Sequence, residues 1–182
     1  MTLRKAFTLM EVNLAIMVMA GGILSIVGLY SLGYRESRQS RDDVASAAYA
    51  DAVFSPIVAA LSATNLKWSA FKDIGCYPSD KGWSDYFNHS TGVVDGDPES
   101  TAKSAFDSII GKAKSAAKGS LDVSASWPAS SMSGGLKGAL VVMHDRDSAI
   151  VRLSFRATRQ KSELLAMPLY YTEVRFQGLG SE

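Results

Sequence analysis

The chain has 182 residues, of which 47% are hydrophobic and 20% charged, and its formal net charge is +1. This length allows one ordinary domain plus an additional segment. The near-neutral charge excludes a strongly basic nucleic-acid-binding protein and a strongly acidic disordered tail. A single cysteine, Cys76, excludes both a disulfide framework within the chain and a zinc site built from several cysteines.

Residues 12–34 form a continuous run without a charged side chain. As a helix, this run would be about 35 Å long at ~1.5 Å per residue, enough to cross a hydrocarbon core of ~30 Å. We therefore expect a membrane-spanning helix. Two alternatives stay open. The run could be the buried core helix of a soluble domain. It could also be part of a secretory signal peptide with Val18-Met19-Ala20 as its cleavage site, and cleavage after Ala20 would leave a chain that begins at Gly21.

The charged residues beside this run do not orient it, because basic residues lie on both sides: Arg4, Lys5, Arg35, Arg38 and Arg41. On the N-terminal edge lies one acid, Glu11. A carboxylate directed toward hydrocarbon costs several kcal/mol at mid-membrane unless a cation lies beside it. Glu11 is therefore expected either to lie among lipid headgroups or to meet a cation at the same depth.

The first residues carry a specific resemblance. The sequence Arg4-Lys5-Ala6-Phe7-Thr8-Leu9-Met10-Glu11-Val12, followed by the apolar run, resembles the N-terminus of type IV pilins and type II secretion pseudopilins. This resemblance implies that a leader, residues 1–6, is removed between Ala6 and Phe7 and that the new terminus at Phe7 is methylated. It also implies that Glu11 is the glutamate used in assembly. Ala6 stands where the family usually carries Gly, and Gly28 stands where many members carry Pro.

The same resemblance implies a location and a set of partners. The leader stays on the cytoplasmic side, where a prepilin peptidase reaches it. Residues 7–34 cross the bacterial inner membrane and later form the core of a filament, so the C-terminal domain faces outward. The implied partners are the prepilin peptidase, other pilin or pseudopilin subunits and inner-membrane lipid, and the assembled filament is periplasmic or on the cell surface.

Residues 35–66 are predicted to continue the helix with an amphipathic pattern. Apolar residues fall at spacings of three and four, which places them on one stripe: Ala47, Ala50, Val53, Phe54, Ile57, Val58 and Leu61. The stripe is too short for several heptads of a coiled coil, so we expect it to pack on a sheet of the same chain. Pro56 is predicted to bend the helix.

Residues 67–182 are predicted to form a globular α+β head, which begins with an ordered, aromatic-rich loop at 67–97. A helix is expected at 99–118, with Asp97 as its N-cap before Pro98 and Gly119 as its end. Its apolar side comprises Ala102, Phe106, Ile109, Ile110, Ala113 and Ala117. The acids of residues 95–99 also permit a calcium-binding loop, although they lack the EF-hand ligand series.

The remaining head sequence predicts strands. One is expected at 121–127, a hairpin at 139–144 and 150–155 around a polar turn at 145–148, and a final strand at 168–176. In the second arm Val151, Leu153 and Phe155 alternate with polar residues, which indicates one buried face. The predicted fold class is α+β, with a long N-terminal helix, membrane-spanning in its first half, packed on a small antiparallel sheet in a pilin-like arrangement.

No catalytic, cofactor-binding or metal site is predicted. The two histidines, His89 and His144, have no ligand partner three or four residues away, and Cys76 is read as a packed apolar side chain. From Arg35 onward, basic and acidic residues balance at 17 each, so no nucleic-acid partner is predicted. The resemblance implies a structural subunit, either a minor pilin or a pseudopilin. The alternatives are a signal-anchored, single-pass protein with an outward-facing binding domain that does not polymerise, and the secreted protein that begins at Gly21.

Overall fold

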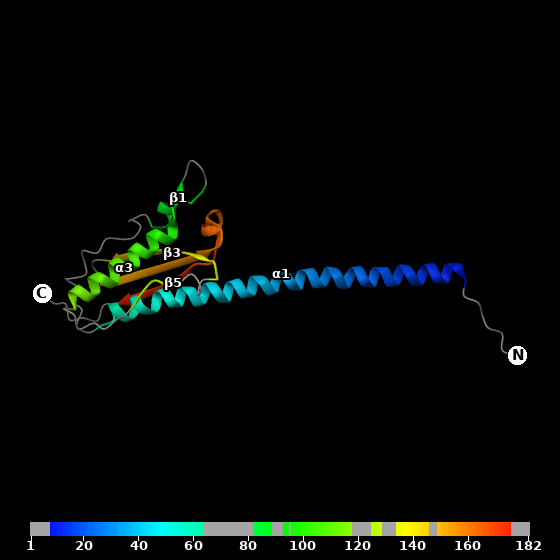
Figure 1. Cartoon of the computed structure of the whole chain (residues 1–182), viewed down its shortest axis with the longest axis horizontal. Helices are drawn as coiled ribbons and strands as arrows, with labels where there is room; N and C mark the ends of the chain where they lie inside the picture. The colour runs from blue at the N-terminus through cyan, green and yellow to red at the C-terminus, as the bar shows by residue number, and fades with distance from the viewer. Residues whose placement is uncertain are drawn as a thin grey trace. The chain divides into compact units, whose positions relative to one another are not determined.

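The computed structural model of the chain describes residues 8–63, 82–88, 93–94, 96–117, 125–128, 134–145 and 149–175. The chain divides into two compact units, Met1–Asp43 and Val44–Glu182. Helix α1 (Leu9–Leu61) contributes residues to both units, and all other helices and strands belong to the second (Figure 1).

Helix α1 is a single helix of 53 residues, which confirms that the apolar run and the amphipathic stretch are continuous. It ends at Leu61, and the Ser62 N–H donates a last hydrogen bond to the Val58 carbonyl at 2.8 Å. The final residues of the predicted 35–66 helix, 64–66, lie outside the described residues. Pro56 lies inside α1 and does not end it; the bend expected there stays a prediction.

The part of α1 in the second unit buries one face. Its buried residues are Ser46, Tyr49, Ala50, Val53, Ile57, Ala60 and Leu61. The inclusion of Ala47 in the predicted stripe is wrong, because Ala47 is exposed, while Phe54 and Val58 are only half-buried. The buried face includes Tyr49, which the predicted stripe did not contain.

The sheet has three antiparallel strands in the order β3-β4-β5. These are β3 (Lys137–Asp145), β4 (Ile150–Thr158) and β5 (Tyr170–Arg175). Leu140 lies opposite Phe155, and Leu153 lies opposite Thr172. The predicted hairpin and the final strand are therefore confirmed, with longer hairpin arms than the sequence indicated.

One face of this sheet packs against two helices, α1 and α3 (Pro98–Ala116), and all six residues predicted for the apolar side of α3 are buried. Val151, Leu153 and Phe155 point into this core as predicted. The rings of Tyr49 on α1 and Phe155 on β4 meet edge to face, with centroids 5.2 Å apart. A hydrogen bond of 2.6 Å joins the hydroxyls of Ser46 and Tyr170. These contacts confirm an α+β fold in which a long N-terminal helix packs on a small antiparallel sheet.

Part of the opposite sheet face is also covered, so the prediction of a single buried face is incomplete. It carries a second cluster made of Tyr86, Ala139, Val141 and Leu164, which come from β3 and from two 3₁₀ helices, η1 (Gly82–Tyr86) and η2 (Lys161–Ala166). The Tyr86 hydroxyl donates to the Leu140 carbonyl at 2.9 Å.

A short ladder, β1 (Phe87–Asn88) with β2 (Val93–Val94), follows η1. The structure thus describes only the later part of the predicted 67–97 loop; residues 67–81 lie outside the described residues.

The strand predicted at 121–127 is wrong for residues 125–127, which have no regular secondary structure, and residues 121–124 lie outside the described set. Trp127 packs edge-on against Phe106 of α3, with ring centroids 5.6 Å apart, and against Tyr49 of α1 at 6.1 Å. Ala125 and Trp127 fit an alternating pattern because both side chains pack against the core, although residues 125–127 lie in no strand.

Asp97 takes the predicted N-cap position of α3, and Pro98 begins the helix. Its carboxylate makes no capping hydrogen bond. Instead Oδ1 lies 3.7 Å from Nζ of Lys137 and 3.9 Å from Nζ of Lys161, which also donates to the Gly96 carbonyl. A carboxylate between two ammonium groups is a poor ligand for calcium, so this arrangement weighs against the calcium-binding alternative at Asp97.

Candidate functional site at the start of α1

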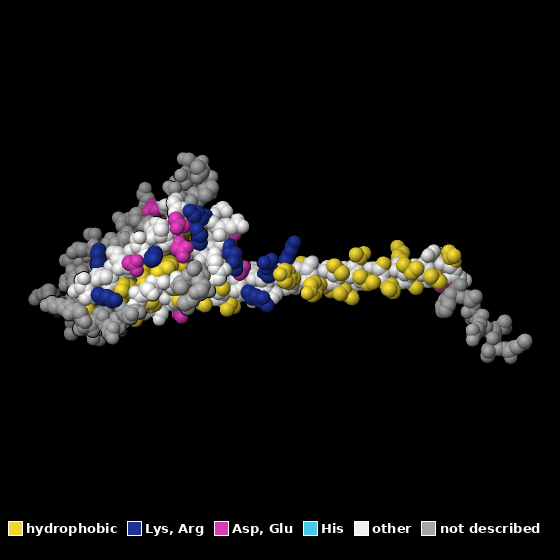
Figure 2. Space-filling view, viewed as in Figure 1, with side chains coloured by type: hydrophobic (Ala, Val, Ile, Leu, Met, Phe, Trp, Pro, Cys, Tyr) yellow, Lys and Arg dark blue, Asp and Glu magenta, His cyan; other side chains and the backbone are white. Residues whose placement is uncertain are grey.

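The first unit consists, in its described part, of the N-terminal portion of α1. The large apolar side chains of this portion are all exposed, from Leu9 at 81% to Tyr34 at 57%. On the face seen in Figure 2, hydrophobic side chains cover this portion until Lys and Arg side chains begin at its C-terminal end. By length and composition, α1 is able to cross a membrane, and it is the one helix with this property in the ranges that the structure describes.

Polar side chains within this apolar portion mostly find partners on their own helix. The hydroxyl of Ser25 donates to the Gly21 carbonyl at 2.8 Å, and that of Ser31 donates to the Gly28 carbonyl at 2.8 Å. A hydroxyl that is bonded in this way carries little polar cost into an apolar environment. The two serines are therefore compatible with a membrane or with a helix bundle.

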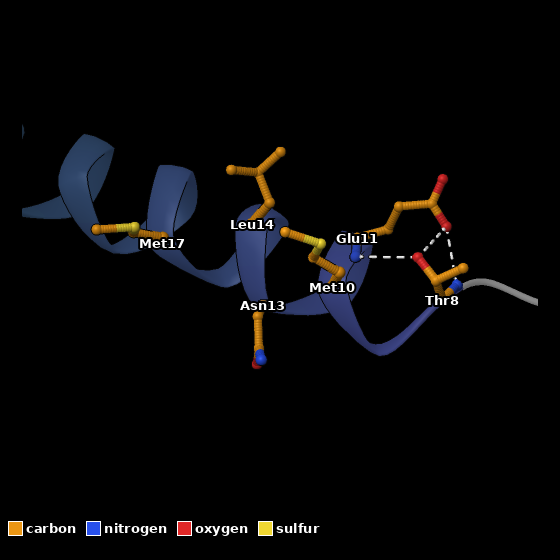
Figure 3. A pocket seen from close by; sticks show the side chains of 6 residues that line it. All are labelled: Thr8, Met10, Glu11, Asn13, Leu14 and Met17. Carbon is orange, nitrogen blue, oxygen red and sulfur yellow. Dashed lines mark hydrogen bonds between the residues drawn. The ribbon is translucent and has the colours of Figure 1, made fainter.

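Glu11 lies in the first turn of α1 and forms a reciprocal cap with Thr8. Oε2 of Glu11 accepts hydrogen bonds from the Thr8 N–H at 2.8 Å and from the Thr8 hydroxyl at 3.0 Å (Figure 3). The Glu11 N–H in turn donates to the Thr8 hydroxyl oxygen at 3.4 Å. This is the capping-box arrangement, which holds the side chain of the third helical residue close to the helix end.

The cap occupies only one of the two carboxylate oxygens. Within the described ranges, Oε1 of Glu11 accepts no hydrogen bond. In Figure 3, this oxygen points away from Thr8. A shallow hollow in the surface of α1 adjoins the carboxylate, and its lining is mostly apolar: Thr8, Met10, Glu11, Asn13, Leu14 and Met17. The site therefore presents a positioned negative charge beside an apolar helix surface.

The structure describes only some of the residues that the sequence analysis singled out. Glu11 is described, whereas Ala6 and Phe7 lie outside the described residues, as do His89 and Cys76. His144 lies half-buried on β3. Among the residues that are described, no three His, Cys, Asp or Glu side chains are grouped as metal ligands would be.

Thr8 is the residue of this candidate site that the sequence analysis missed. The signal was present, because Thr8 and Glu11 have the spacing of the Thr-x-x-Glu capping box directly before an apolar run. Threonine carries no charge, so the need to neutralise Glu11 does not by itself point to Thr8.

No protein-family model matches this chain, and no match was found among curated proteins or among solved structures.

Proposed function

We propose that this chain is a pilin-like structural subunit, a minor pilin or pseudopilin of a type IV pilus or type II secretion-like filament, and not an enzyme. Prepilin peptidase removes the leader between Ala6 and Phe7, and the new amine at Phe7 is methylated. The subunit waits in the bacterial inner membrane as a single-pass protein with its head outside. It then joins other pilin or pseudopilin subunits in a periplasmic or cell-surface filament.

The observation that carries this proposal is the position of Glu11. Its carboxylate lies in the first turn of a helix whose first portion is apolar and exposed, and one of its oxygens has no hydrogen-bond donor in the described chain. The Thr8 donors reduce the cost of removing this carboxylate from water, but they do not neutralise it. A cation at the same depth would complete the site.

The terminal amine of a neighbouring subunit supplies such a cation in the proposed filament. Leaving a buried charge without a counter-ion costs several kcal/mol, so only an axial offset that brings amine and carboxylate together is favourable. The pair thereby sets the register between subunits. The apolar portions of the helices exchange lipid contacts for contacts with one another as the filament core forms.

The second half of α1 supports the same proposal. Its buried face, with Tyr49, Val53 and Ile57, attaches the helix to the sheet through contacts within the second unit. One continuous helix therefore carries both the apolar segment and the attachment to the head. This is the arrangement that a filament subunit needs if a helical core is to display a folded domain.

Mass spectrometry of the mature N-terminus, on protein purified from its native membranes, tests the processing step. N-methylated Phe at position 7 is the expected result. An intact Met1 would replace the proposal by the signal-anchored protein that does not polymerise. A chain that begins at Gly21 would replace it by the secreted protein.

Substitution of Glu11 tests the assembly step. Glu11→Gln keeps the side-chain length and can still accept the Thr8 hydrogen bonds, but it removes the charge. We expect filament incorporation to fall at least tenfold while the head stays folded and the chain stays in the membrane. Glu36→Gln, an exposed acid in the same unit, is the matched control and should assemble normally. Normal incorporation of Glu11→Gln would refute the role given to this carboxylate.

A further inference from the structure

We propose that two copies of this chain associate side by side in the bilayer, through a seam of α1 that is centred on hydrogen bonds between their Asn13 side chains. The inference rests on the membrane anchoring in the proposed function. It does not depend on leader cleavage or on filament formation, so it can fail while those stand.

The first observation is that Asn13 lacks a partner. Ser25 and Ser31 donate to carbonyls of their own helix. The carboxamide of Asn13 forms no hydrogen bond with any residue that the structure describes, although it lies inside the charge-free run. An amide has two donor hydrogens and an acceptor oxygen, and it loses free energy in an apolar environment unless these groups are bonded.

A second copy of the same chain is the partner that complements this group. Two copies inserted by the same route lie parallel, with both Asn13 side chains at the same depth. A carboxamide is self-complementary, because each N–H can donate to the oxygen of the other, and a two-fold axis between the helices satisfies both at once. Asparagine is among the residues that join helices across membranes in this way.

The surface around Asn13 has the period that parallel helices need. Residues follow one another from Asn13 at alternating spacings of four and three, a mean of 3.5, along one seam: Asn13, Met17, Ala20, Leu24, Val27 and Ser31. Met17, Leu24 and Val27 are 75%, 72% and 61% exposed, so nothing within the described first unit covers them.

Two glycines flank the seam one heptad apart. A Cβ built at Gly21 or at Gly28 would meet no atom within 4 Å, so no contact in the described chain requires these glycines. Each costs about 1 kcal/mol of helix stability relative to alanine. Their small size allows a second helix to approach closely, which strengthens van der Waals packing and shortens the amide–amide distance.

Asn13 and Met17 of the seam also line the hollow beside Glu11, but Asn13 lies on a different side of the helix from the Glu11 carboxylate. At about 100° per residue, Asn13 lies about 200° around the helix from Glu11. In Figure 3, the Asn13 side chain projects downward, whereas those of Glu11 and Leu14 project upward. A dimer along the seam therefore leaves the Glu11 carboxylate accessible to a further copy.

Cysteine cross-linking of the full-length chain in bacterial membranes tests the inference. In a Cys76→Ser background, Met17→Cys places a thiol on the seam, and Val18→Cys places one about 100° away as the matched control. Under a mild oxidant, Met17→Cys should form disulfide-linked dimers and Val18→Cys should not. Equal cross-linking of the two variants would overturn the proposed seam.

Substitution at Asn13 then tests the hydrogen bond. Asn13→Leu in the Met17→Cys background should weaken self-association about three- to twentyfold, the range given by hydrogen bonds between membrane helices. Ser25→Ala, which removes a hydroxyl bonded within its own helix, should leave it unchanged. Because leucine is more apolar than asparagine, Asn13→Leu cannot fail by losing membrane insertion.

Unchanged dimer formation in Asn13→Leu would overturn the inference while leaving the filament proposal intact. Recovery of the chain in the aqueous fraction after carbonate extraction would instead overturn the membrane anchoring on which both depend.

Discussion

Replacing Gly138 with alanine tests how α1 is attached to the sheet. Gly138 lies on β3, beneath the two rings that join the helix to the strands. A Cβ at this position would lie 2.5 Å from Cζ and 2.6 Å from Cε2 of Phe155, and 3.1 Å from Cε1 of Tyr49. Phe155 is fully buried and meets Tyr49 edge to face, so a movement of its ring also displaces the ring on α1.

The expected cost follows from these distances. Carbon atoms in contact are normally about 3.5–4.0 Å apart, so the Phe155 ring must move by about 1 Å. Overpacking of this kind costs about 1–3 kcal/mol. Replacing a glycine inside a strand with alanine by itself stabilises the folded state by about 0.5–1 kcal/mol. We therefore expect Gly138→Ala to lower the free energy of unfolding by about 1–2 kcal/mol, which corresponds to roughly 3–8 °C in Tm.

Denaturant unfolding of the full-length chain in detergent, followed by tryptophan fluorescence, measures this loss. Trp127 packs against Tyr49, so its emission reports on the same region. Gly111→Ala is the matched control, because a Cβ there would meet nothing within 4 Å and Gly111 lies inside α3. That substitution should raise stability by about 1 kcal/mol.

A double-mutant cycle with Phe155→Leu separates overpacking from other causes. Leucine leaves room for the new methyl group, so Gly138→Ala should cost less in the Phe155→Leu background than in the parent chain. Additive losses, or a Gly138→Ala chain as stable as the parent, would refute the reasoning that Gly138 is required by these two rings.

Two further predictions concern the head. Burial, followed by the negative charge of Glu99, raises the pKa of Tyr49 to about 12, so stability should be fully present below about pH 10 and fall between about pH 10 and pH 12, as the unfolded chain ionises first. Tyr49→Phe should remove about 3 kcal/mol of that fall, because the difference of about two units between the folded and unfolded pKa of Tyr49 disappears. The substitution should change stability little at pH 7, since the Tyr49 hydroxyl has no hydrogen-bond partner among the described residues. An unchanged alkaline profile would contradict this prediction. The guanidinium of Arg156 lies 5.0 Å from the Trp83 ring centroid and donates to the Leu165 carbonyl, so Arg156→Lys should cost about 1 kcal/mol in denaturant unfolding. Arg152→Lys, which alters an exposed pair with Glu173, should cost less than about 0.5 kcal/mol, and equal losses would argue against a special role for the stacked side chain.

Local patterns were enough to predict much of the fold. The apolar run and the stripe after it predicted α1. The apolar side of the 99–118 segment predicted α3 and six residues that are buried, but it did not include Ala105, which is buried as well. Alternation along residues 150–155 predicted the hairpin and its inward-facing residues. These elements are predictable because the spacing of the apolar side chains that must be buried differs between a helix and a strand, and this spacing is visible within a short stretch of sequence.

The predictions failed where a residue's environment depends on distant segments. Trp127 packs against Tyr49 and Phe106 instead of lying in a strand. Asp97 is the N-cap residue of α3 as predicted, but its carboxylate faces Lys137 and Lys161 and makes no capping hydrogen bond. No spacing along the chain encodes these contacts, because each pairs residues from different elements.

The sequence by itself thus determined that the chain begins with a long apolar helix bearing an acid in its first turn, because hydropathy and spacing are local properties. Only the tertiary structure decided that Tyr49 faces the sheet and that the far side of the sheet carries a second cluster around Tyr86. The physical reason is that these outcomes depend on shape and distance between groups, which a chain acquires only when its elements have packed.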